Sequence, residues 1–123
     1  MTNYTRGIFI DANNQKVSMI LLNSQYLLKE LYEAIGCSYV ERIPLTNDHD
    51  LIIDEEGRLK DGNLGFKLDG TLIVGNAIIL GVDEADWVDC KIPLRMVETH
   101  VAYLNKEEVK SLIEDDFLEV KWI

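Results

Sequence analysis

The stretch from Leu51 to Gly81 most constrains the fold. Two apolar runs, Leu51–Asp54 and Leu72–Leu80, have the length and composition of buried strands. Gly75-Asn76 interrupts the second run and predicts a tight turn or bulge within it. Between the runs lies a glycine-spaced loop that holds much of the positive charge in the middle of the chain. This arrangement is typical of a small module centred on a β-sheet.

The N-terminal third predicts a β-hairpin followed by a helix. Residues 7–11 and 17–22 are apolar runs separated by Asn13-Asn14, which favour a turn. Ser24 is the expected N-cap of a helix over residues 25–35, and Gly36 is its expected left-handed stop. A strand over residues 39–43 should follow and end at Pro44.

The remaining segments predict short strands, loops and C-terminal helices. We expect Arg58–Lys60 to return as a short strand and residues 61–70 to form a loop. Apolar spacing predicts a helix over residues 93–105. Asn105 with Glu108 resembles a capping box, which predicts another helix to about Asp115. Leu118, Val120 and Trp122 alternate with charged residues, which favours a final strand.

These elements predict an α+β fold: a small, mostly antiparallel sheet, one helix after the first hairpin, and C-terminal helices. At 123 residues the chain is expected to be a single domain, 1–123. Its core should span about residues 7–90, with a helical and strand extension over 92–123. With 47% hydrophobic residues, this core needs no metal or disulfide.

The charge is strongly acidic, with 12 basic against 22 acidic residues and a net charge of −10. Such a chain is expected to bind nucleic acids poorly in general. Most of that affinity comes from lysine and arginine side chains that neutralise phosphates and release counterions. The charge serves either solubility alone or the attraction of a basic protein partner. Neither a signal peptide nor a membrane span is expected, and Cys37 and Cys90 read as reduced thiols of a cytoplasmic protein.

The candidate ligand-binding residues are Arg58, Lys60, Asn63, Lys67 and Asn76. The first four lie in or beside the glycine-spaced loop, where backbone N–H groups and cations could approach a phosphate or carboxylate. The competing interpretation is that these cations pair with neighbouring acids on the surface. Asn76 either serves the turn or points its amide into a pocket.

No catalytic or metal-ligating constellation is predicted, and no cofactor. Asp83-Glu84-Ala85-Asp86 matches a helicase acidic box, but the phosphate loop that this chemistry requires is missing. His49 and His100 are the two histidines of the sequence, and no serine or cysteine lies in a nucleophile motif that either could activate. Enzymatic activity is therefore the minority hypothesis; it would use carboxylates near Asp54 and Asp86.

Several short motifs occur in the order of a known family. They are Ile-Gly-Cys-Ser-Tyr-Val-Glu at 35–41, Asp-Glu-Glu-Gly-Arg-Leu at 54–59, Ile-Val-Gly-Asn-Ala at 73–77 and Asp-Trp-Val at 86–88. Over residues 7–90 the chain resembles the domain of unknown function 3846 of bacteriophages and plasmids, which is sometimes associated with antirestriction-type proteins. The resemblance implies a mobile-element protein inside a bacterial cell and supplies no catalytic residues.

Together these observations favour a non-enzymatic accessory protein that counters host defence by binding. Two targets fit: a host defence protein engaged by the acidic surface, or a small anionic signal such as a nucleotide held at the basic loop. The alternative is a small hydrolase or nucleotide-modifying enzyme. The apolar edge of the expected C-terminal strand, Leu118–Trp122, also suggests a homodimer.

Overall fold

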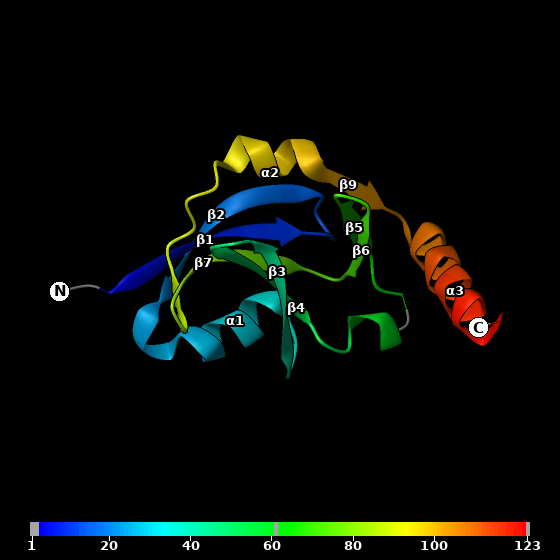
Figure 1. The fold of residues 1–123 in the computed structure, drawn as a ribbon, viewed down its shortest axis with the longest axis horizontal. Helices are drawn as coiled ribbons and strands as arrows, with labels where there is room; N and C mark the ends of the chain where they lie inside the picture. Colours follow the sequence, from blue (N-terminus) through cyan, green and yellow to red (C-terminus); the bar gives the residue numbers. More distant parts are fainter. Residues whose placement is uncertain (1–2, 61, 123) are drawn as a thin grey trace.

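Two antiparallel sheets form the framework of the protein (Figure 1). The computed structural model describes residues 3–60 and 62–122, with side chains as far as Glu114. Within these residues the larger sheet has the order β2-β1-β7-β4-β3, with β8 also on β7, and the smaller has the order β6-β5-β9. In chain order the elements are β1 (Tyr4–Asp11), β2 (Lys16–Asn23), η1 (Ser24–Tyr26), α1 (Leu27–Ile35), β3 (Val40–Thr46), β4 (His49–Asp54), η2 (Gly57–Leu59), β5 (Gly65–Leu68), β6 (Thr71–Val74), β7 (Ala77–Asp83), β8 (Asp86–Val88), α2 (Leu94–His100), β9 (Val101–Leu104) and α3 (Lys106–Trp122).

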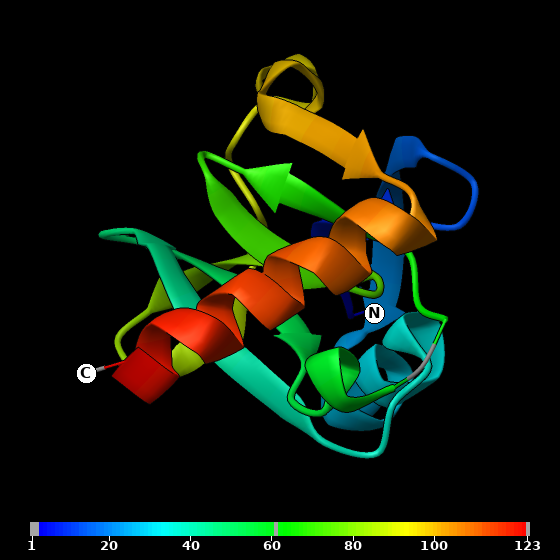
Figure 2. The same ribbon diagram turned by 90° about the vertical axis from the view of Figure 1, so that its right-hand side faces the viewer.

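The larger sheet separates two apolar cores. On one face, Ile52, Ile78 and Leu80 pack against Leu31 and Ile35 of α1. On the opposite face, other residues of β1, β4 and β7 pack against the smaller sheet and against Val97 of α2. Figure 2 shows α1 and the smaller sheet on opposite sides of the larger one. The fold is therefore α+β, as the sequence predicts.

The strongest local signals of the sequence are confirmed. β1 and β2 pair along their whole length, from Tyr4–Asn23 to Asp11–Lys16. Gly36 ends α1 with a φ of 81°, a left-handed conformation that glycine adopts without steric cost. Asn105 and Glu108 form a reciprocal capping box, in which each side chain accepts the other's backbone N–H.

Two details of the N-terminal third are corrected. Asn23, not Ser24, caps the helical segment by accepting the N–H of Gln25; Ser24 instead bonds the hydroxyl of Thr5. A 3₁₀ turn, η1, precedes α1. Pro44 does not end β3 but lies within it, which is possible because β3 is an edge strand and proline need not donate to a further neighbour.

Three segments of the second half also differ from the expectation. Arg58–Lys60 is not a strand, since residues 57–59 form the 3₁₀ turn η2. The expected loop over 61–70 contains β5, which pairs with both β6 and β9. The helix expected over 93–105 ends at His100, and Val101–Leu104 continue as β9. Pairing with β5 provides hydrogen-bond partners for the backbone N–H and C=O groups of this segment. This pairing overrides the helix that the spacing of the apolar residues predicts.

The expected C-terminal strand is wrong. Residues 118–122 belong to α3, which continues without a break from Lys106 to Trp122. Once the capping box has nucleated a helix, each added residue costs little, whereas a strand needs a neighbour to pair with. The homodimer suggested through Leu118–Trp122 therefore loses its structural basis. Within the described residues, no helix is long and apolar enough to cross a membrane.

Close packing around β7 yields a test of the fold. A Cβ at Gly81 would overlap the backbone oxygen of Asp89, which a side-chain rotation cannot relieve. We expect Gly81→Ala to lower the free energy of unfolding by on the order of 3 kcal/mol. Gly70→Ala is the control: its site has a φ of 82° but open space, so about 1 kcal/mol is expected. Urea unfolding of both variants measures the difference, and equal losses would contradict the packing.

Candidate functional site

The structure brings three of the five predicted ligand residues together and separates the other two. Arg58, Lys60 and Asn63 lie on one side of a cleft of about 530 Å³, and the first turns of α3 form the other side. Figure 2 shows η2 beside α3. We call this the cationic cleft; its lining residues are Arg58, Lys60, Gly62, Asn63, Lys106, Glu107, Val109, Lys110, Ile113 and Glu114.

The packing of η2 against β6 positions one wall of the cationic cleft. Gly57 is buried, and a Cβ there would lie 2.5 Å from the backbone oxygen of Val74, so only glycine fits. Arg58 donates from Nη2 to the backbone oxygen of Leu72 at 3.2 Å. Across the cleft, Lys106 extends toward Gly62: its Nζ would lie 3.9 Å from a Cβ built there.

Lys60 and Asn63 are engaged by the protein itself. The Nζ of Lys60 donates to Oδ2 of Asp54 at 2.6 Å, and this hydrogen bond raises the pKa of the lysine. Asp54 is buried and also accepts the N–H of Glu56. The amide of Asn63 donates to the backbone oxygen of Gly57 at 3.4 Å. These contacts fix the loop, so they limit what the same groups can offer a ligand.

The cations best placed for a ligand are ones that the sequence reasoning missed. Lys106 and Lys110 line the cleft, and neither forms an ion pair with another described residue. Their spacing of four places both on one face of a helix. The capping box at Asn105 predicted that helix, so the signal was present, but only the tertiary structure turns this face toward η2.

Lys67 and Asn76 lie outside the cationic cleft. Lys67 is half-buried on β5, opposite Leu72 and Ala102. The side-chain oxygen of Asn76 accepts the backbone N–H of Ala12 at 2.9 Å, so it ties the end of β1 to the turn before β7. This contact agrees with the interpretation that Asn76 serves the turn, and its role in ligand binding stays a prediction.

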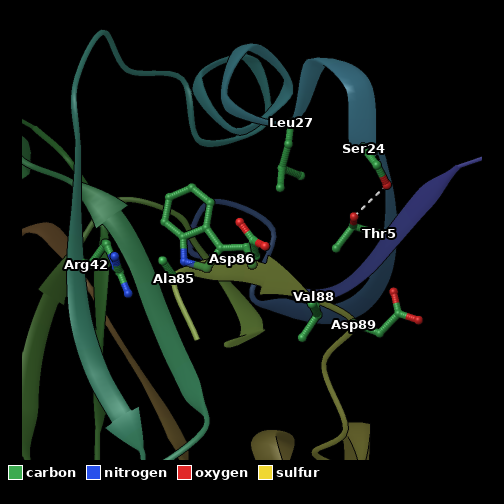
Figure 3. A pocket seen from close by; sticks show the side chains of 9 residues that line it. Thr5, Ser24, Leu27, Arg42, Ala85, Asp86, Val88 and Asp89 are labelled. Carbon is green, nitrogen blue, oxygen red and sulfur yellow. Dashed lines mark hydrogen bonds between the residues drawn. The ribbon is translucent and has the colours of Figure 1, made fainter. Parts of the chain in front are cut away.

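A second concavity, of about 740 Å³, opens beside the start of α1 (Figure 3). Its distinctive feature is a cluster that the sequence did not reveal. Arg42 donates from Nε to Oδ2 of buried Asp50 at 2.7 Å, and Trp87 donates its indole N–H to the same oxygen at 3.1 Å. The guanidinium carbon lies 5.5 Å from the Trp87 ring centroid. This cluster satisfies a buried carboxylate and joins β3, β4 and β8.

Exposed carboxylates gather around the β7–β8 turn and the start of β4. We call Asp48, Asp83, Glu84, Asp86 and Asp89 the acidic patch; Asp48, Asp83 and Asp89 line a further concavity of about 480 Å³. Hydrogen bonds from Thr46 and His49 lower the pKa of Asp48. Within the described residues, no group of three acidic, histidine or cysteine side chains could hold a metal ion.

His49 is a structural residue by its contacts. It is buried, and its Nε2 accepts the backbone N–H of Lys91 at 3.0 Å. The ring proton therefore sits on Nδ1, which faces Oδ1 of Asp48 at 2.9 Å. Both thiols are free, and burial raises the pKa of Cys37 and of Cys90.

The Lys60–Asp54 pair yields a stability test. Lys60→Met leaves a buried carboxylate with one partner fewer, but Lys60 is 42% exposed and solvent screens the pair. We therefore expect a loss of about 1 kcal/mol at pH 7. Because folding raises the pKa of Lys60, the contribution is present at neutral pH and disappears as the pH rises beyond the ordinary lysine range.

Lys110→Met is the matched control, expected within about 0.5 kcal/mol of the parent protein. Thermal or urea unfolding at pH 7 and at high pH measures both variants. Equal stability of the two variants at pH 7 would contradict a structural role for Lys60.

Comparison with known proteins agrees with the resemblance noted in the sequence. The family described as a domain of unknown function, DUF3846, matches residues 5–107, from β1 to the start of α3. No curated protein and no solved structure matches the chain. The chain thus belongs to the DUF3846 family, and its match includes α2 and β9, which lie beyond the residues that carried the resemblance.

Proposed function

We propose that this protein is a non-enzymatic accessory protein of a phage or other mobile element, and that it counters host defence by sequestering a small anionic signal. The cationic cleft is the proposed binding site, and a nucleotide is the proposed class of ligand. The observation that carries the proposal is the convergence of cations from two distant chain segments in a protein of net charge −10.

The chemistry of the cleft suits a phosphate-bearing ligand. Lys106 and Lys110 supply mobile ammonium groups, which bind phosphate as point charges. Arg58 and Lys60 add positive potential from the opposite wall, although both also bond to the protein. Ile113 adds a partly exposed apolar side chain to the lining of the cleft, which can face the base of a nucleotide. Val109 also borders the cleft but is buried in the core with Leu72 and Val74.

The enzymatic alternative receives less support. Asp54 and Asp86, its proposed carboxylates, lie near opposite ends of β7: Asp54 follows Ile53, which pairs with Ala77, and Asp86 pairs with Asp83. Six residues of strand separate these positions by about 20 Å, too far for two carboxylates to act on one bond. The carboxylate of Asp54 also accepts a hydrogen bond from Lys60.

A thermal-shift screen tests the anion site. A nucleotide at one hundred times its dissociation constant should stabilise the protein by about 2.7 kcal/mol, or several degrees in Tm. Lys106→Glu combined with Lys110→Glu should abolish this shift, because both free cations are reversed. Lys29→Glu with Arg95→Glu changes the net charge equally at exposed positions on α1 and α2 and should keep it.

Three results would count against sequestration of a nucleotide. The first is the absence of a shift with any nucleotide, and the second is an unchanged shift in the double variant. The third is recovery of a chemically altered nucleotide after incubation with the pure protein, which would favour the enzymatic alternative.

A host defence protein is the second candidate target, and the acidic patch favours it. Five exposed carboxylates, around the β7–β8 turn and the start of β4, form a surface complementary to a basic partner. Retention of a host protein at low salt should be lost at high salt, since exposed charges are screened.

Variants sharpen this second test. Asp83→Lys with Asp86→Lys should abolish retention of that protein, as measured by pull-down and mass spectrometry. Glu33→Lys with Glu98→Lys makes the same change in net charge at exposed positions on α1 and α2 and should preserve it. Equal behaviour of the two pairs would remove the acidic patch from consideration.

A further inference from the structure

The two outer edges of the larger sheet differ in how well they are protected. β3, at one edge, contains Pro44, a register irregularity between Pro44 and Thr46, and the exposed charges of Glu41 and Arg42. These features discourage another strand from pairing there. β2, at the other edge, has eight residues in unbroken register with β1 and no proline, and its only charge is Lys16 at its start.

The outward backbone groups of β2 belong to its odd-numbered residues. Ser24 donates its N–H to Asn3 on the β1 side, whereas Asn23 donates its N–H away from β1, to the carboxylate of Glu30. Since strand residues alternate, the N–H and C=O groups of Val17, Met19 and Leu21 also point away from β1. No described strand lies beyond β2 to accept them.

The side chains along this edge are apolar and exposed. Met19 is 57% and Leu21 is 61% exposed, and both point to the same face of the sheet. Figure 2 shows the blue β1–β2 hairpin at the upper right of the molecule, where β2 forms the edge of the larger sheet. An edge of this kind is a template for a further strand.

We infer that a second copy of this chain pairs with β2 in antiparallel register, with Ile20 on the two-fold axis. In this register Met19 lies opposite Leu21 of the partner, and Leu21 opposite its Met19. These are the residues whose backbone groups point outward, so the pairs can exchange hydrogen bonds in both directions. The exposed apolar side chains then cover one another.

The charges at the ends of β2 are complementary in the same register. Lys16 lies on the sheet face that carries α1, and it falls opposite Ser24 of the second copy. The carboxylate of Glu30 is held close to that position by accepting the outward N–H of Asn23, so Asn23 does not donate this N–H to the second copy. Two symmetric lysine–glutamate contacts follow. Because β3 is protected, the pairing closes as a dimer instead of continuing into a fibre.

This pairing does not depend on the proposed anion site. Sedimentation velocity over a range of concentrations at physiological salt, where repulsion between the two acidic chains is screened, should reveal a monomer–dimer equilibrium. Leu21→Lys should weaken dimerisation at least tenfold, because it places two like charges in the pairing region. Leu28→Lys, an equivalent change at an exposed position on α1, should leave dimerisation unchanged.

A cross-linking experiment tests the register. Two cysteines at position 20 would face each other across a non-hydrogen-bonded pair, with Cα atoms about 4.5 Å apart, within the range of a disulfide. Ile20→Cys should therefore form a covalent dimer under mild oxidation, whereas Ser18→Cys, which falls opposite Leu22, and the parent protein should not. A monomer at all concentrations, or a dimer that Leu21→Lys leaves intact, would overturn the inference.

Discussion

β7 is the strand on which the rest of the structure depends, because it must be buried on both faces. Ile78 and Leu80 face the core beneath α1, while Ala77 and Ile79 face the core beneath the smaller sheet. Along its edges it pairs with β1, β4 and β8. A strand in this position can carry no unpaired polar side chain, because burying such a group without a hydrogen-bond partner costs free energy. Its run of apolar residues, ended by Gly81 where the backbone of Asp89 passes, follows from that constraint.

The proposed binding surfaces lie where this framework ends. The cationic cleft forms beyond the end of β4, where η2 packs on β6 and α3 crosses beside it. The acidic patch forms at the other end of β7, around the turn to β8. The larger sheet thus separates the acidic patch from the cations of the cleft, although Glu107 and Glu114 also line the cleft. The two proposed targets, an anionic ligand and a basic protein partner, would therefore meet the molecule at opposite ends of β7.

Several sequence expectations succeeded because they depend on local chemistry. Gly36 stops α1 for a steric reason that needs no tertiary contact. The capping box of Asn105 and Glu108 involves residues only three apart. Two of the expectations that failed concern pairing over distance. Val101–Leu104 has helical spacing but becomes β9, because β5 offers a partner strand. The alternation at residues 118–122 has no such partner and continues as helix.

The sequence by itself determined the class of fold, the buried character of β7, the stop of α1 at Gly36, the capping box of α3 and the excess of negative charge. These properties follow from side-chain volume, hydrophobicity and backbone preference, which each residue carries with it. Only the tertiary structure decided that Lys106 and Lys110 face Arg58, that Asn76 serves β1, and that Arg42 and Trp87 share the carboxylate of Asp50. These groups are far apart in the chain, and sheet pairing and close packing, not local preference, bring them within reach of one another.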